Sequence, residues 1–203
     1  MLEAAIETTC PPWLPDADSL IRGPEDLPID VALLGDQLGL DEREIFDEIA
    51  RVWRKYDDSA QRALGAAGET ALVHWLEENV SARVVQVSLF DDAAGFDVAL
   101  IVGGRAQARV EVKATRRADS VKVFLSRNEL DTMRVHSNWC LQVVHLNADD
   151  TIRYLSWIAP ETLLAAEPRD GLWASWQSMK ITLPAHELRS GTAPPIDALL
   201  LSQ

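Results

Sequence analysis

Two acidic residues and a lysine are spaced in a way that suits metal-dependent chemistry. Glu111 and Lys113 are separated by one residue, and Asp97 lies fourteen residues before Glu111. In a β-strand, residues i and i+2 share a face and lie about 7 Å apart. Carboxylate oxygens suit Mg²⁺, which binds one or two carboxylates, keeps several waters and contacts substrate phosphate directly. A lysine beside the ion can orient a metal-bound water or stabilise charge developing on phosphate.

A glycine pair between the two acids predicts the hairpin that would bring them together. Glycine tolerates the positive φ angles that tight turns need. We expect a three-residue loop over 103–105, because this register pairs Asp97 with Glu111 and gathers the apolar side chains on the opposite face. A two-residue loop would shift the register by one step and scramble that pattern. Two carboxylates opposed across a strand pair repel each other unless a cation lies between them.

Glu69 is a fourth candidate, in a helix expected over 59–79. The residues three, four and seven positions later are all apolar: Leu72, Val73 and Leu76. The Glu69 carboxylate would therefore lie along the inward stripe, where an unpaired charge is costly and a metal ion or a lysine would rationalise it. The alternative is that Glu69 lies at the edge of the stripe and reaches water.

The elements that must position these residues predict an α/β fold in three parts. Residues 1–58 form an acidic, proline-rich lead-in with a helical extension, 59–190 form the core, and 191–203 form a loosely ordered tail. Prolines between 11 and 28 predict irregular structure there. Helices are expected over 30–38, 41–56, 59–79, 126–136 and 160–166, and strands over 83–89, 96–102, 107–114, 121–125, 139–146, 152–158 and 177–183.

Two of these helices begin with a capping signature. Asp41 is followed three residues later by Glu44, and Ser126 by Glu129. Such pairs satisfy backbone N–H groups at a helix start. For Glu129 we favour this capping role, with a second role near the site left open.

Charge is distributed unevenly along the chain. The net charge is −13, which by itself argues against a nucleic-acid ligand. Residues 1–50 hold thirteen acidic residues against two arginines, whereas 105–134 hold eight basic against four acidic ones. This basic middle region permits a phosphate-binding face, and an exposed basic loop is its alternative. The candidate nucleic-acid-binding residues are Thr115, Arg116, Arg117, Lys122 and Asn128.

The acidic helices between 30 and 56 could be a helix-turn-helix, but its recognition helix would carry five acidic residues that repel DNA phosphates. We therefore expect a packing element or a docking site for a protein partner. The same helices could instead cover the basic face. A homo-oligomer is compatible with the sequence.

No targeting or membrane segment is predicted. The first ten residues carry Glu3 and Glu7 where a signal peptide would carry Lys or Arg, and no apolar run approaches the length of about 20 residues that crosses a bilayer. The two cysteines are too few for a disulfide framework. These observations favour a cytoplasmic protein.

Several motifs together resemble a known family. They are Gly68-Glu69, Gly95-Phe96-Asp97, Val110-Glu111-Val112-Lys113-Ala114-Thr115 and Phe124-Leu125-Ser126-Arg127-Asn128-Glu129-Leu130. Over roughly residues 60–160 the chain resembles the NO VEIN C-terminal-like domain family, which belongs to the PD-(D/E)XK nuclease-like superfamily.

This resemblance implies a restriction-endonuclease-like core, with a mixed central sheet flanked by helices. It further implies that Glu69, Asp97 and Glu111 bind Mg²⁺, for which Mn²⁺ can substitute, and that Lys113 completes the catalytic set. Phe96 stands where the motif name has proline. The expected function is a metal-dependent endonuclease acting on DNA, of a kind found in bacterial restriction or phage defence. A catalytically inactive nuclease-fold module that binds nucleic acid or a protein is the alternative.

Overall fold

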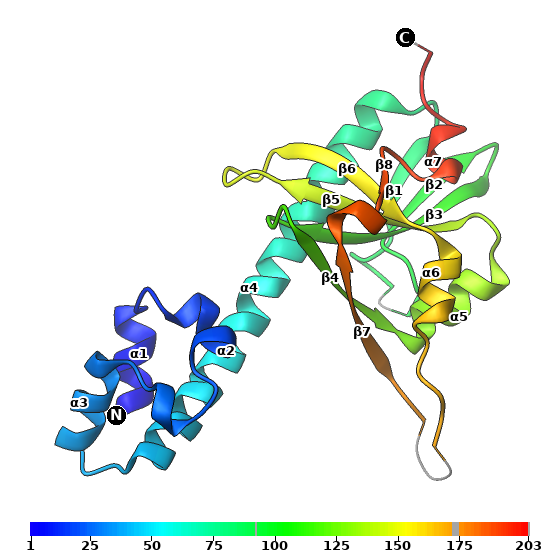
Figure 1. Cartoon of the computed structure of the whole chain (residues 1–203). Helices are drawn as coiled ribbons and strands as arrows, with labels where there is room; N and C mark the ends of the chain where they lie inside the picture. Colours follow the sequence, from blue (N-terminus) through cyan, green and yellow to red (C-terminus); the bar gives the residue numbers. More distant parts are fainter. Residues whose placement is uncertain (92, 172–174, 203) are drawn as a thin grey trace. The chain divides into compact units, whose positions relative to one another are not determined.

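The chain folds into two compact units, residues 1–63 and 64–203, in a computed structural model that describes residues 1–91, 93–171 and 175–202 (Figure 1). The first unit is helical and the second is α/β. No helix within these described ranges is both long enough and apolar enough to cross a membrane.

The first unit builds its core from short helices. They are α1 (Leu2–Thr9), α2 (Ala17–Leu20), α3 (Ile29–Gln37) and the first part of α4 (Glu42–Asn79), with 3₁₀ turns at Leu14–Asp16 and Pro24–Asp26. The proline-rich segment is therefore less irregular than its sequence predicts. Pro15 and Pro24 stand in the first positions of the 3₁₀ turns, where a missing N–H costs nothing, and Leu14 and Ile21 are buried in the core.

Helix α4 is continuous over 38 residues, so the expectation of two helices, 41–56 and 59–79, is wrong. Asp57, Asp58 and Ser59 are poor helix formers, but neither Gly nor Pro interrupts the segment, and low propensity alone does not end a helix. The boundary expected at residue 58 therefore falls inside α4. Its capping box is confirmed, because Glu44 N–H donates to Asp41 Oδ1 at 2.8 Å and Asp41 N–H donates to Glu44 Oε2 at 2.9 Å.

A mixed six-stranded sheet forms the centre of the second unit, as the sequence predicts. Its strand order is β1-β2-β3-β5-β6-β8, and β3 and β5 are parallel while every other neighbouring pair is antiparallel. The strands are β1 (Arg83–Gln86), β2 (Val98–Val102), β3 (Arg105–Thr115), β5 (Trp139–Leu146), β6 (Ile152–Ile158) and β8 (Arg189–Ser190).

The two faces of the sheet bury two different cores. On one face, Leu72 and Leu76 of α4 pack with Val110 and Val112 of β3. On the other face, Leu141 and other β5 side chains pack with a separate two-stranded ribbon and two helices (Figure 1). The ribbon pairs β4 (Ser120–Ser126) with β7 (Ser178–Pro184), and the helices are α5 (Arg127–Val135) and α6 (Pro160–Ala165). Because side chains alternate along a strand, Glu111 and Lys113 lie on this second face.

The hairpin loop differs from the expected one, although the register at the site agrees. Val102 pairs with Arg105, so the loop contains only Gly103 and Gly104, both with positive φ. An extra residue at Gln107 then shifts the register by one step, which restores the alternation beyond it. A three-residue loop was the wrong prediction, and the bulge is the reason that the apolar face is nevertheless preserved.

The segment after Ser190 is ordered, contrary to the expected loose tail. Helix α7 (Pro194–Asp197) places Ile196 in the core beneath the sheet, and Gln142 of β5 accepts a hydrogen bond from Ala193 N–H at 2.9 Å. Leu200 forms a bridge with Val80 at the end of α4. The sequence did not predict these contacts, because each of them joins the tail to a residue far away in the chain.

Candidate active site

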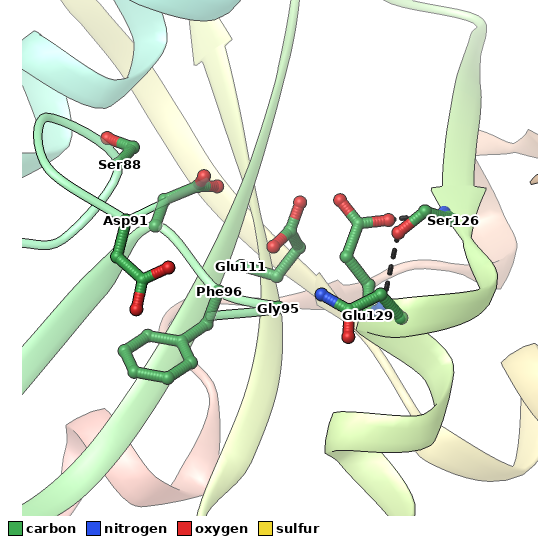
Figure 2. Close-up of a pocket in the computed structure, with 9 residues that line it drawn as sticks. Ser88, Asp91, Gly95, Phe96, Glu111, Ser126 and Glu129 are labelled. Carbon is green, nitrogen blue, oxygen red and sulfur yellow. Dashed lines mark hydrogen bonds between the residues drawn. The ribbon is translucent and has the colours of Figure 1, made fainter. Parts of the chain in front are cut away.

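A pocket of about 130 Å³ opens between the loop before β2, the middle of β3 and the start of α5 (Figure 2). It combines acidic and polar groups from three parts of the chain that lie far apart in sequence. The lining residues are Ser88, Asp91, Gly95, Phe96, Asp97, Glu111, Ser126, Asn128 and Glu129. Four of these are carboxylic acids, which makes the pocket a strongly acidic recess in the locally basic part of the chain.

Glu111, Lys113 and Glu129 form a compact charged cluster beside the pocket. Lys113 Nζ donates to Glu111 Oε1 at 2.5 Å and to Glu129 Oε1 at 3.2 Å. Glu111 is only 2 % exposed, and the other two side chains are largely shielded from water. The structure therefore brings Glu111 and Lys113 together as predicted, and adds Glu129 as a third member.

Burial dominates the electrostatics of this cluster. Burial raises the pKa of Glu111 well above its usual range, since the opposing charge of Lys113 only partly offsets it and Glu129 adds to it. Burial by itself would lower the pKa of Lys113, but Glu111 and Glu129 outweigh it and raise that pKa. Burial also acts to raise the pKa of Glu129, yet hydrogen bonding with Glu111 and the charge of Lys113 bring it below its ordinary value. Lys113 is thus held as an ammonium between two unequal carboxyl groups.

Asp97 approaches the cluster from the start of β2. Its backbone N–H donates to Val110 O at 3.0 Å, and its Oδ2 accepts a hydrogen bond from Val112 N–H at 2.8 Å. Burial raises the pKa of Asp97 to about 6, the Val112 hydrogen bond opposes this rise, and the nearby charge of Glu69 adds to it. Asp97 lines the same pocket as Glu111, as the predicted hairpin register requires.

Glu69 lies near Asp97 but is held by neighbours of its own. Its Oε2 accepts hydrogen bonds from Ser88 Oγ at 2.6 Å and from Gln86 Nε2 at 3.2 Å. Glu69 does not line the pocket. Its carboxylate is therefore satisfied by β1 and the loop after it, and its closest link to the site is the electrostatic one with Asp97.

Two glycines allow these elements to approach one another. A Cβ on Gly68 would lie 2.4 Å from the Ala114 Cβ, so only glycine lets α4 pack this closely on β3. Gly95 has a φ of +74°, and a Cβ there would lie 2.2 Å from Thr132 Oγ1 of α5. Gly95 O also accepts a hydrogen bond from the indole of Trp139 at 2.9 Å. These contacts fix the loop that carries Asp97 against β5 and α5.

The start of α5 positions Glu129 through its cap. Ser126 Oγ accepts from Glu129 N–H at 3.1 Å, and Glu129 Oε2 accepts from Ser126 N–H, which confirms the predicted capping box (Figure 2). The other oxygen of Glu129 contacts Lys113. One carboxylate thus caps the helix and holds the lysine, which the capping signature could not reveal because it reports only local contacts. Asp91 and Ser88 were also missed, and no spacing signal marks them.

The predicted phosphate-binding residues are dispersed. Thr115 is buried and accepts from Arg117 N–H at 3.0 Å, while exposed Arg116 is paired with Asp150. Asn128 lines the pocket, where its Nδ2 donates to Ala93 O at 2.9 Å. The other two candidates are exposed, one in the loop after β3 and one on β4: Arg117 and Lys122.

The donor set fits a hard divalent cation with few protein ligands. Within the described ranges, no group of three His, Cys, Asp or Glu side chains is arranged to hold a metal ion. Mg²⁺ needs only one or two carboxylates together with water and substrate oxygens. Asp97 and Glu111 supply two carboxylates in one recess, and the burial that raises both pKa values is the environment that an added positive charge would relieve.

Fold and site together define an α/β domain whose mixed sheet carries an acidic pocket with a largely shielded lysine beside it. Residues 68–155 match the family model described as "Protein NO VEIN, C-terminal", and this segment belongs to that domain family. The resemblance expected from the motifs is thereby confirmed for the family. No curated protein and no solved structure was found to match the chain.

Proposed function

We propose that the chain is a metal-dependent nuclease that hydrolyses phosphodiester bonds, with DNA as its substrate. The observation that carries this proposal is that Asp97 and Glu111 line one pocket, with Lys113 hydrogen-bonded to Glu111 beside it. Placement in the PD-(D/E)XK nuclease-like superfamily, and a setting in restriction or phage defence, are further parts of the proposal that rest on resemblance alone.

Each side chain has a role that its surroundings favour. Asp97 and Glu111 would hold Mg²⁺ or Mn²⁺, which when bound supplies a Lewis acid and a water of lowered pKa. Lys113 remains charged, so it can stabilise negative charge on the phosphate or orient the attacking water. Glu69 would act on Asp97 through charge, and a direct metal contact would require it to leave Ser88 and Gln86.

Plasmid cleavage in the presence of Mg²⁺ or Mn²⁺ tests this function. We expect Asp97→Ala and Lys113→Ala each to lower the cleavage rate by about a hundredfold or more, the size of effect typical for a group that stabilises transition-state charge. Asp119→Ala is the matched control, because Asp119 is an exposed acid in the loop before β4. Equal activity in all four proteins would refute the assignment.

The structure also gives support to a second function, a non-catalytic nucleic-acid-binding module. Lys113 forms ion pairs with both Glu111 and Glu129, and the described residues offer no group of three His, Cys, Asp or Glu side chains arranged to hold a metal. Calorimetric titration with Mn²⁺ distinguishes the two functions. Absence of binding heat, together with retained association with DNA, would favour the module over the nuclease.

A further inference from the structure

The outer face of the β4–β7 ribbon has a composition that its packing role does not explain. Side chains alternate along both strands, so one face packs on the central sheet and the other faces away from it. The inward residues are all buried: Val121, Val123, Leu125, Met179, Ile181 and Leu183. The outward positions carry Lys122, Phe124 and Lys180, which are exposed.

Phe124 stands at the middle of this outer face. Its side chain is 43 % exposed, although β4 already buries three apolar residues on its other face. Phe124 pairs directly with Lys180 across the ribbon, and Lys180 Nζ lies 5.6 Å from the centre of the ring. An aromatic ring with a cation over it offers a flat stacking surface beside a positive charge, the two features with which proteins hold an unpaired nucleotide.

The charge of the ribbon contrasts with that of the chain. Its strands, 120–126 and 178–184, contain two lysines and no Asp or Glu, within a protein of net charge −13. A phosphate backbone approaching an acidic protein is repelled by most of its surface, so a locally cationic face determines where it can settle.

The ribbon also leads to the pocket. Ser126 is the last residue of β4 and lines the pocket, and Phe124 lies two residues before it, about 7 Å along the strand. A distance of this size is comparable to the spacing of one or two nucleotides in an extended strand. A nucleic-acid strand with one base stacked on Phe124 could therefore continue past Ser126 towards Asp97 and Glu111.

We propose that the outer face of the β4–β7 ribbon binds a single-stranded segment of nucleic acid and guides it to the pocket. This inference rests on the proposed nuclease function, and it names a substrate conformation. Phe124 stacks on an unpaired base, and Lys180 turns from the ring to a phosphate. A duplex such as plasmid DNA must first open locally, because the faces of its paired bases are stacked on one another and cannot reach the ring.

Fluorescence anisotropy in EDTA tests the surface separately from catalysis. The probe is a fluorescein-labelled oligothymidylate of about 20 nucleotides, longer than a typical single-strand site. We expect Phe124→Leu to weaken binding by at least about fivefold, the lower end of the effect of removing one stacking ring. We expect Lys180→Gln to flatten the slope of log K against log salt by about 0.7, the value for one lost phosphate contact on a single strand.

Tyr154→Leu is the matched control. Tyr154 is 39 % exposed on β6, stacks on His145 and has the Arg153 guanidinium 5.1 Å from its ring centre, so it is an exposed aromatic ring beside a cation away from the ribbon. We expect this variant to bind as the wild type does. Thermal melting of each variant establishes that it is folded, which exposed substitutions should preserve.

The outcomes separate the surface from the proposed chemistry. Binding that depends on Phe124, without cleavage of any substrate, would support the surface and overturn the nuclease. Cleavage that is insensitive to Phe124→Leu and Lys180→Gln would support the nuclease and overturn the surface. Preference for a duplex probe, or no binding to oligothymidylate and to the matching oligouridylate, would also overturn the surface, and the latter result would point to a protein ligand.

Discussion

Neutralising Asp97 should stabilise the metal-free protein. Burial raises the pKa of Asp97 from 3.8 to about 6, and a rise of this size corresponds to about 3 kcal/mol of folding free energy lost when the group is charged. Asp97 is only partly buried, so screening by water reduces this figure to roughly 1–2 kcal/mol. An asparagine side chain in its place can still accept the hydrogen bond from Val112 N–H, so Asp97→Asn removes the charge and retains the contact.

The pH dependence follows from the direction of the shift. Between about pH 4 and pH 6 the folded state binds more protons at Asp97 than the unfolded state does, so stability falls as pH rises through this window. Above this window Asp97 is charged in both states, and the folded state carries the full loss of stability. Below it Asp97 is protonated in both states, and the loss disappears. We therefore expect Asp97→Asn to raise the Tm by roughly 2–8 °C near neutral pH and to have little effect near pH 4.

Thermal unfolding in EDTA and in MgCl₂ provides the measurement, with Asp119→Asn as the exposed control. Wild-type protein should gain about 1.4 kcal/mol when Mg²⁺ is present at ten times its dissociation constant, whereas Asp97→Asn should gain less. The reasoning is refuted if Asp97→Asn is less stable than wild type in EDTA at neutral pH, or if it stabilises the protein as much at pH 4 as at neutral pH. Either result would show that the charge of Asp97 does not destabilise the folded state.

Three further substitutions test how the site is built. Gly68→Ala should destabilise the fold by about 1–3 kcal/mol in urea unfolding because its Cβ meets that of Ala114, and Ala114→Gly in the same chain should restore part of the loss. Gly95→Ala should lower the Tm and weaken metal binding together, since both its φ and its contact with α5 oppose a side chain; unchanged melting would contradict this. Ser126→Ala should cost about 1 kcal/mol by removing the α5 cap, and should reduce activity beyond any loss of folded protein if the cap also positions Glu129.

Local periodicity was sufficient to predict most elements of the second unit. Strand β6 and the start of α5 follow from alternation and from the Ser126 cap, both of which are encoded within a few residues. The continuity of α4 was not predictable in the same way, because Asp57 and Ser59 weaken a helix without ending it, and a helix 38 residues long exceeds the usual range.

The hairpin shows how a correct site can follow from an incorrect local model. The sequence pattern predicted that Val98 pairs with Val110, because this register keeps the apolar side chains on one face of the hairpin. A three-residue loop was the simplest way to achieve this register, and the structure achieves it with a two-residue turn and a bulge at Gln107. Hydrophobic burial fixed the register at Asp97 and Glu111, and the turn adapted to it.

The contacts that complete the site are long-range, and for that reason the spacing of residues did not reveal them. Glu129 reaches Lys113 from sixteen residues away because α5 is capped at the end of a strand that belongs to a different sheet. A largely shielded lysine between two carboxyl groups contributes little net stability, since the cost of removing charges from water rivals their attraction. Apolar side chains of similar volume would serve the core equally well at Glu111, so an acid at this position is in keeping with the chemistry that we propose for the pocket.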